Sequence, residues 1–144
     1  MKYIKLFENF SFKEYIEEIT TLCLVELEDD GYQVSVIPRL ASDTTTIEGE
    51  SYIVSIGQID QLTNFTDIED YLMTYVDLIG SKSDMKINNI NAFLKGNCEG
   101  YNSNRVSLNY IQKETLDFNG SDDDFFKYIR NKPMRSIMFV IDKI

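Results

Sequence analysis

The C-terminal segment MRSIMFVIDKI, residues 134–144, constrains the fold more than any other, because five apolar residues follow one another from Ile137 to Ile141. An uninterrupted apolar run of this kind is typical of a central strand in a sheet that is covered on both faces. The run is much shorter than the roughly 20 apolar residues of a membrane-spanning helix. We therefore expect a layered fold built around this strand.

Three other segments alternate apolar with polar residues, as half-buried strands do. The first two, YQVSVIPR (residues 32–39) and SYIVSIGQI (residues 51–59), are expected to form an antiparallel hairpin with a long loop. Pro38 places the end of the first strand at a sheet edge or a bulge. The third segment is RVSLNYIQKE, residues 105–114. With the C-terminal segment, they predict a mixed or antiparallel sheet of about four strands.

Two main helices flank the hairpin. Ser11 and Glu14 form a capping box at the start of the first helix. Its apolar stripe occupies positions 12, 15, 16, 19, 22 and 23, and Gly31 provides the residue that ends it. Thr66 and Glu69 form a second capping box, which precedes a second apolar stripe. Both helices are therefore expected to pack one face against the sheet.

Residues 81–104 fit no single pattern. The stretch DMKINNINAFLKG is compatible with a ragged strand, but Ile87, Ile90 and Leu94 share one face of a helix. Gly96 would then end that helix. Asparagine weakens both interpretations, and we favour the helix.

The segment GSDDDFF, which precedes the C-terminal strand, has two interpretations. Asp117, Asn119, Ser121 and Asp123 alternate like the start of a calcium-binding EF-hand loop. That loop requires glycine at its sixth position and glutamate at its twelfth, where this chain has aspartate and tyrosine. We favour the start of a short helix at residues 122–131, with Ser121 as its cap and the carboxylates in its first turn.

Together these elements predict a single α+β domain that comprises residues 1–144. In this arrangement the two main helices pack on one face of the sheet and the short third helix connects two strands. The strand at residues 105–114, the short helix and the C-terminal strand fit a right-handed crossover between parallel neighbours.

The chain lacks the residues on which most catalytic sites depend. It contains no histidine, which removes the commonest general base and most zinc sites. Cys23 and Cys98 lack CxxC spacing and are expected to be reduced thiols, the first in the core and the second in a loop. No phosphate-binding loop, dinucleotide-binding motif or nucleophile elbow occurs. We expect no enzymatic activity, metal site or cofactor.

Charge is distributed unevenly along the chain. The net charge is −10, yet residues 14–81 hold fifteen acidic residues and one basic residue, a net charge of −14, while the flanks at residues 1–13 and 82–144 carry +2 each. If the two main helices pack on one side of the sheet, their acidic faces would merge into one surface. We expect this surface to bind a partner through Glu14, Glu17, Glu18, Glu28, Asp29, Asp30, Asp67, Glu69, Asp70 and Asp77.

A basic surface on another protein is the partner that such a field favours, because it would offset the self-repulsion of the acidic residues. Direct binding to nucleic acid or to an anionic membrane is disfavoured by the same charge. The N-terminal residues interleave charges with aromatic side chains and lack the apolar core of a signal peptide. We therefore expect a cytoplasmic protein.

The opening MKYIKLFENF, together with LVELEDDGYQVSV at residues 24–36, resembles the start of small uncharacterised accessory proteins of large tailed bacteriophages. The resemblance covers the N-terminal region and carries over no catalytic residue. It implies a phage origin and action inside the bacterial cytosol, where acidic phage proteins of this size often inhibit host machinery.

The sequence thus predicts a non-catalytic acidic protein of the inhibitor or nucleic-acid-mimic type, which engages a basic surface of a host protein, the nucleic-acid-binding class included. One alternative is a carboxylate- or metal-dependent hydrolase that uses Asp67, Asp70 and Asp77, which share one helical face. Acidic first turns are, however, ordinary at helix N-termini. Another alternative is a protein of virion assembly.

Overall fold

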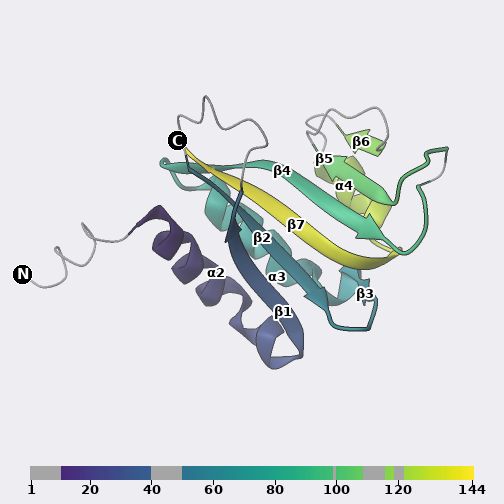
Figure 1. Cartoon of the computed structure of the whole chain (residues 1–144), viewed down its shortest axis with the longest axis horizontal. Coiled ribbons are helices and arrows are strands. Elements are labelled where there is room, and N and C mark those ends of the chain that lie inside the picture. The colour runs from purple at the N-terminus through teal and green to yellow at the C-terminus, as the bar shows by residue number, and fades with distance from the viewer. Residues whose placement is uncertain (1–10, 40–49, 99, 109–115, 119–121) are drawn as a thin grey trace, which may run out of the picture.

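A computed structural model describes residues 11–39, 50–98, 100–108, 116–118 and 122–144. Within these residues, helices lie against a mixed sheet, and Figure 1 shows α3 behind the central strands. The elements are α2 (Phe12–Asp29), β1 (Tyr32–Pro38), β2 (Ser51–Gln58), β3 (Thr63–Asn64), α3 (Phe65–Gly80), β4 (Met85–Leu94), β5 (Arg105–Leu108), β6 (Leu116–Phe118), α4 (Asp122–Ile129) and β7 (Pro133–Lys143).

The strands are ordered β1-β2-β7-β4-β5-β6, and the short β3 also pairs with β7. Every pairing is antiparallel except that between β5 and β6, which is parallel. The α+β class and the central position of the C-terminal strand are therefore confirmed. The described sheet has seven strands rather than about four, partly because β3 and β6 are too short to show an alternating pattern.

The helix favoured within residues 81–104 is wrong, because this region contains β4. A bulge shifts its register against β7 between Ile87 and Asn89. The extra residue puts Ile87 and Ile90 on one face of the sheet although they are three positions apart, a spacing that imitates a helix. The asparagines are accommodated on the other face, where Asn91 accepts a hydrogen bond from Ser107 and donates one to Asn89.

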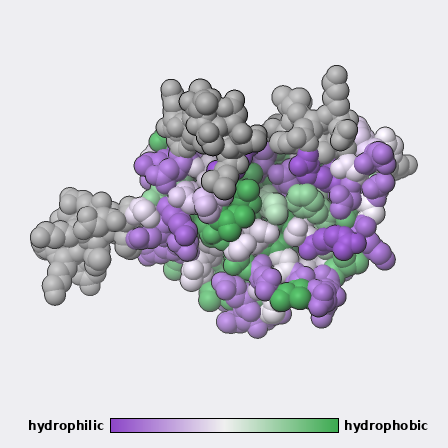
Figure 2. All heavy atoms as spheres, viewed as in Figure 1, coloured by the Kyte–Doolittle hydropathy of each residue, from purple (hydrophilic) through white to green (hydrophobic). Residues whose placement is uncertain are grey.

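The two faces of the sheet differ in chemistry. On the helix-covered face, a row of paired residues contains Val34, Ile56, Ile137 and Ala92. The adjacent row on the other face contains Ser35, Ser55, Met138, Asn91 and Ser107. Figure 2 shows apolar as well as polar side chains on the side of the molecule viewed in Figure 1. The apolar run in β7 has only half-buried Met138 and buried Val140 on the second face.

The predicted helix starts fare differently. The cap of α2 is confirmed, because the Ser11 hydroxyl accepts a hydrogen bond from the Glu14 amide at 3.1 Å. Gly31 follows α2 with φ +96°, a conformation that glycine adopts without strain. The capping box predicted at Thr66 is wrong, since α3 begins one residue earlier at Phe65. The fully buried Phe65 ring stacks on Phe126 of α4, and this packing fixes the start of α3.

The short third helix is confirmed as α4, while its predicted cap Ser121 lies outside the described residues, as does Asn119 of the EF-hand alternative. β5 and β7 are both antiparallel to β4, so they run in the same direction, but β4 lies between them. The predicted crossover therefore does not join neighbouring strands. Because residues 85–94 were expected to form a helix, the predicted sheet had no strand between β5 and β7.

A buried hydrogen bond joins α2 to α3. The Thr20 and Tyr75 hydroxyls lie 2.8 Å apart, and both residues are buried. Burial raises the pKa of the Tyr75 hydroxyl, so the tyrosine remains a neutral partner at physiological pH. This bond fixes how the two helices are aligned along their lengths.

Tyr75→Phe is expected to lower the free energy of unfolding by about 1–3 kcal/mol, because it leaves the Thr20 hydroxyl buried without its partner. Urea denaturation measures the change. The double variant Tyr75→Phe/Thr20→Val, in which both polar groups are removed, should recover most of the loss. A double variant no more stable than the single one would show that the bond does not matter.

Candidate functional site

The helices α2 and α3 pack side by side in opposite directions. Thr20 meets Tyr75, and six residues further along α2 the Glu26 carboxylate accepts a hydrogen bond of 2.7 Å from the hydroxyl of Tyr71, which precedes Tyr75 by four residues. Contacts that move forward on one helix and backward on the other define an antiparallel pair. The C-terminal end of α2 therefore lies beside the N-terminal end of α3, and both of these ends carry acidic residues.

Acidic side chains converge where these ends meet. The hydrogen bond to Glu26 is the main cause of the raised pKa of Tyr71, and the charges of Asp30 and Asp70 add to it. The pKa of Tyr32 is raised by burial and then by the charges of Asp67 and Asp30. The two tyrosines therefore lie near acidic residues of both helices. We call this group the acidic seam, which comprises Glu26, Asp30, Asp67 and Asp70.

All four residues of the acidic seam are exposed. Among the described residues, a salt bridge joins Arg130 to Glu69, and no residue of the acidic seam takes part in it. The distance from Arg130 Nε to Glu69 Oε1 is 2.7 Å, and a second contact from Nη2 to Oε2 is 3.3 Å. Glu69, one of the residues expected to bind a partner, is half-buried and forms this salt bridge within the molecule.

The other predicted residues are exposed on the two helices. They continue the negative surface away from the acidic seam, both towards the N-terminus of α2 and towards the C-terminus of α3. Glu26 is absent from the predicted set, although it is one of the acidic residues near the end of α2. The exposed residues outside the acidic seam are Glu14, Glu17, Glu18, Glu28, Asp29 and Asp77.

Two apolar side chains are exposed within the acidic face of α2. Leu22 is 73% exposed and Val25 is 43% exposed. Leu22 was assigned to the buried stripe, and that assignment is wrong. At 100° per residue it lies about 200° around the helix from both Thr20 and Leu24, which face inward. The predicted stripe was displaced around the helix, because it included Leu22 and omitted the buried Leu24 and Leu27.

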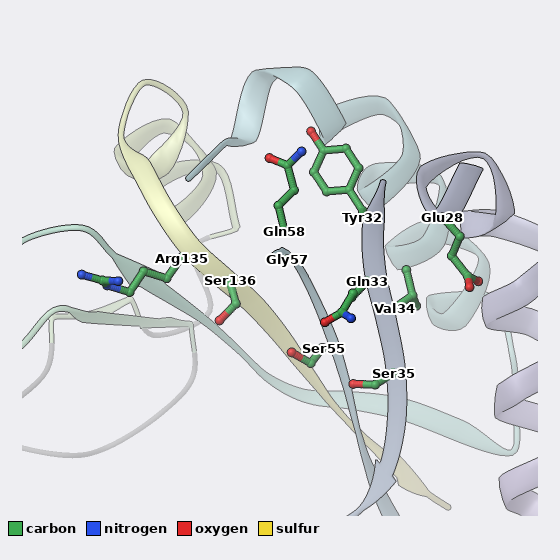
Figure 3. Close-up of a pocket in the computed structure, with 10 residues that line it drawn as sticks. All are labelled: Glu28, Tyr32, Gln33, Val34, Ser35, Ser55, Gly57, Gln58, Arg135 and Ser136. Atoms are coloured by element: carbon green, nitrogen blue, oxygen red, sulfur yellow. The ribbon is translucent and has the colours of Figure 1, made fainter. Parts of the chain in front are cut away.

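A polar hollow lies next to the β1–β2 hairpin. Figure 3 shows Ser35 and Ser55 pointing to one side of the hairpin, with Glu28 of α2 beyond β1. Gly57 forms part of its lining and lies close to β7, because a Cβ at this position would come within 2.9 Å of the Arg135 carbonyl oxygen. Only glycine leaves space for this close approach of the two strands.

Among the described residues, no group of three or more histidine, cysteine, aspartate or glutamate side chains could hold a metal ion. Asp67, Asp70 and Asp77 therefore form no such group. Cys23 is half-buried against the core, and the buried Cys98 thiol donates a hydrogen bond to the Arg105 carbonyl oxygen. In the part of the chain that the structure describes, no helix is long and apolar enough to cross a membrane.

The fold and the acidic seam define a two-layer α+β protein with an anionic helical surface. Comparison of the chain with protein-family models, with curated proteins and with solved structures finds no match.

Proposed function

We propose that the protein is a non-catalytic binding protein whose acidic helical surface engages a basic surface on another protein. The observation that carries the proposal is the acidic seam, in which exposed carboxylates from two helices converge around Tyr71. Bringing like charges together costs free energy, and a basic partner would recover that cost on binding.

The exposed apolar residues of α2 support a protein partner over a small cation. Leu22 and Val25 lie among acidic side chains, and Leu22 is largely exposed. Protein interfaces combine a desolvated apolar centre with a polar rim, so that apolar contacts supply affinity while charges supply orientation and rate. The acidic face of α2 offers both components on one helix.

With the N-terminal resemblance, this surface suggests a phage-encoded protein that acts in the bacterial cytosol. Its partner would be a basic host protein, including the nucleic-acid-binding class, whose nucleic-acid site the acidic surface would occupy. The protein itself would not bind nucleic acid, because its net charge is −10.

The proposal predicts steep salt dependence. When this protein is immobilised, it should retain a basic partner from bacterial lysate at low salt and release that partner as the salt concentration rises. Salt screens the attraction between the two surfaces, because the Debye length falls from about 30 Å at 0.01 M to about 3 Å at 1 M. The released protein, once purified, should then bind about tenfold more weakly at high salt in a titration. Retention that does not change with salt would contradict an electrostatic surface.

A further inference from the structure

Among the described residues, β1 pairs with β2 alone, so its other side is a free sheet edge. The Arg39 amide donates to the Ser51 carbonyl oxygen at 2.9 Å, which fixes the residues of β1 that face β2. In an antiparallel pair the facing residues alternate. Ser35 and Ile37 therefore bond to β2, while the amide and carbonyl groups of Val34 and Val36 point to the free edge.

Two devices that often block edge-to-edge pairing, charged side chains and bulges, are absent from β1 between Tyr32 and Ile37. Pro38 lies in the outward row, where it lacks an amide that would otherwise be unpaired. The edge from Tyr32 to Val36 can therefore accept a further strand.

Acidic side chains of α2 lie alongside this edge. Glu28 lines the hollow beside β1 together with Val34, near the start of the strand. The start of α2 lies near the other end, because the Phe12 ring packs against Tyr52, which pairs with Pro38, and Glu17 follows five residues after Phe12. Eleven residues are close to three helical turns, so Glu17 and Glu28 lie on the same face of α2.

We propose that β1 is a docking edge for an extended basic segment of the partner, which adds to the sheet as a further strand alongside α2. Backbone hydrogen bonds to Val34 and Val36 would supply affinity, and side chains on one face of the added strand would meet Glu17 and Glu28. Because successive side chains of a strand alternate between faces, the segment carries its basic residues at every second position.

Charge selects this occupant over a second copy of the chain. Pairing β1 with β1 of another copy would bring two acidic α2 helices together, and like charges in close contact are repulsive. The inference rests on the proposed function, because it assumes that the partner is basic. It adds the conformation of the bound segment and the edge at which it binds.

The test uses a fluorescent peptide in which lysine alternates with threonine, together with a peptide of the same composition whose lysines form one block. The alternating peptide should bind more tightly. N-methylation of its lysine amides and of its threonine amides should have unequal effects, because only one set of amides faces β1. We expect about a tenfold loss for one set and little change for the other. Equal effects of the two sets would overturn the proposal.

The protein variants give an independent measurement. Val36→Pro removes an outward amide that β2 does not use, whereas Val36→Ala shortens the side chain but keeps the amide. We expect Val36→Pro to bind the alternating peptide about tenfold more weakly than Val36→Ala. Equal affinities of the two folded variants would overturn strand addition. If Val36→Pro does not fold, the N-methylated peptides alone test strand addition. Sedimentation that shows a dimer of the free protein, disrupted by Val36→Pro, would also overturn it.

The outcomes separate this inference from the proposed function. If Asp30→Lys/Asp67→Lys weakens peptide binding while Val36→Pro does not, the acidic surface stands and strand addition fails. If neither the peptide nor any basic protein from the lysate binds in a salt-dependent manner, the proposed function fails, and this inference fails with it.

Discussion

Phe139→Ala is expected to lower the free energy of unfolding by about 3–5 kcal/mol. Phe139 is fully buried in the middle of β7, where it pairs with Val54 on one side and Ile90 on the other. Its ring also packs edge-on against Tyr75 of α3, with centroids 5.6 Å apart. Truncation therefore leaves a cavity between the sheet and α3, and rigid neighbouring strands prevent it from closing.

Urea denaturation should show this loss as a fall in the midpoint of about 2 M, given typical slopes for small proteins. Met138→Ala is the matched control, since Met138 is the preceding residue, points to the other face of the sheet and is only half-buried. We expect it to cost about 1 kcal/mol. Equal losses for the two variants would mean that both faces of β7 are packed to the same degree.

The sequence was sufficient for elements whose pattern is local. The α2 cap at Ser11, the hairpin of β1 and β2 and the apolar run of β7 each depend on residues close together in the chain, and each was predicted correctly. β4 was missed because its bulge replaces the two-residue period of a strand by a three-residue step. That step has the spacing of one helical turn, and only the pairing with the partner strand distinguishes the two.

The candidate site was predictable in kind but not in arrangement. The excess of acids on the two helices was visible in the sequence, whereas their antiparallel packing brings together residues such as Thr20 and Tyr75, which lie 55 positions apart. Glu26 was therefore not selected, although Tyr71 binds it directly. The pairing of Glu69 with Arg130 was equally hidden, because the two residues lie 61 positions apart.

Reversing charge in the acidic seam is expected to weaken partner binding about a hundredfold, because lysine in place of aspartate turns attraction to a basic surface into repulsion worth several kcal/mol. The variant is Asp30→Lys/Asp67→Lys, which changes one residue of the acidic seam at the end of α2 and one in the first turn of α3. Its affinity for the basic partner purified from lysate is measured by titration at low salt.

Asp84→Lys/Asp123→Lys is the matched control, since it raises the net charge by the same amount. Both residues are exposed, and neither contributes to the raised pKa values of Tyr32 and Tyr71. Lysine is favourable at the C-terminal end of α2 and unfavourable at the N-terminal end of α3, by a few tenths of a kcal/mol each, so the melting temperature of the acidic seam variant should change little. If the two variants lose affinity equally, binding responds to net charge alone, and the acidic seam is not the partner's site.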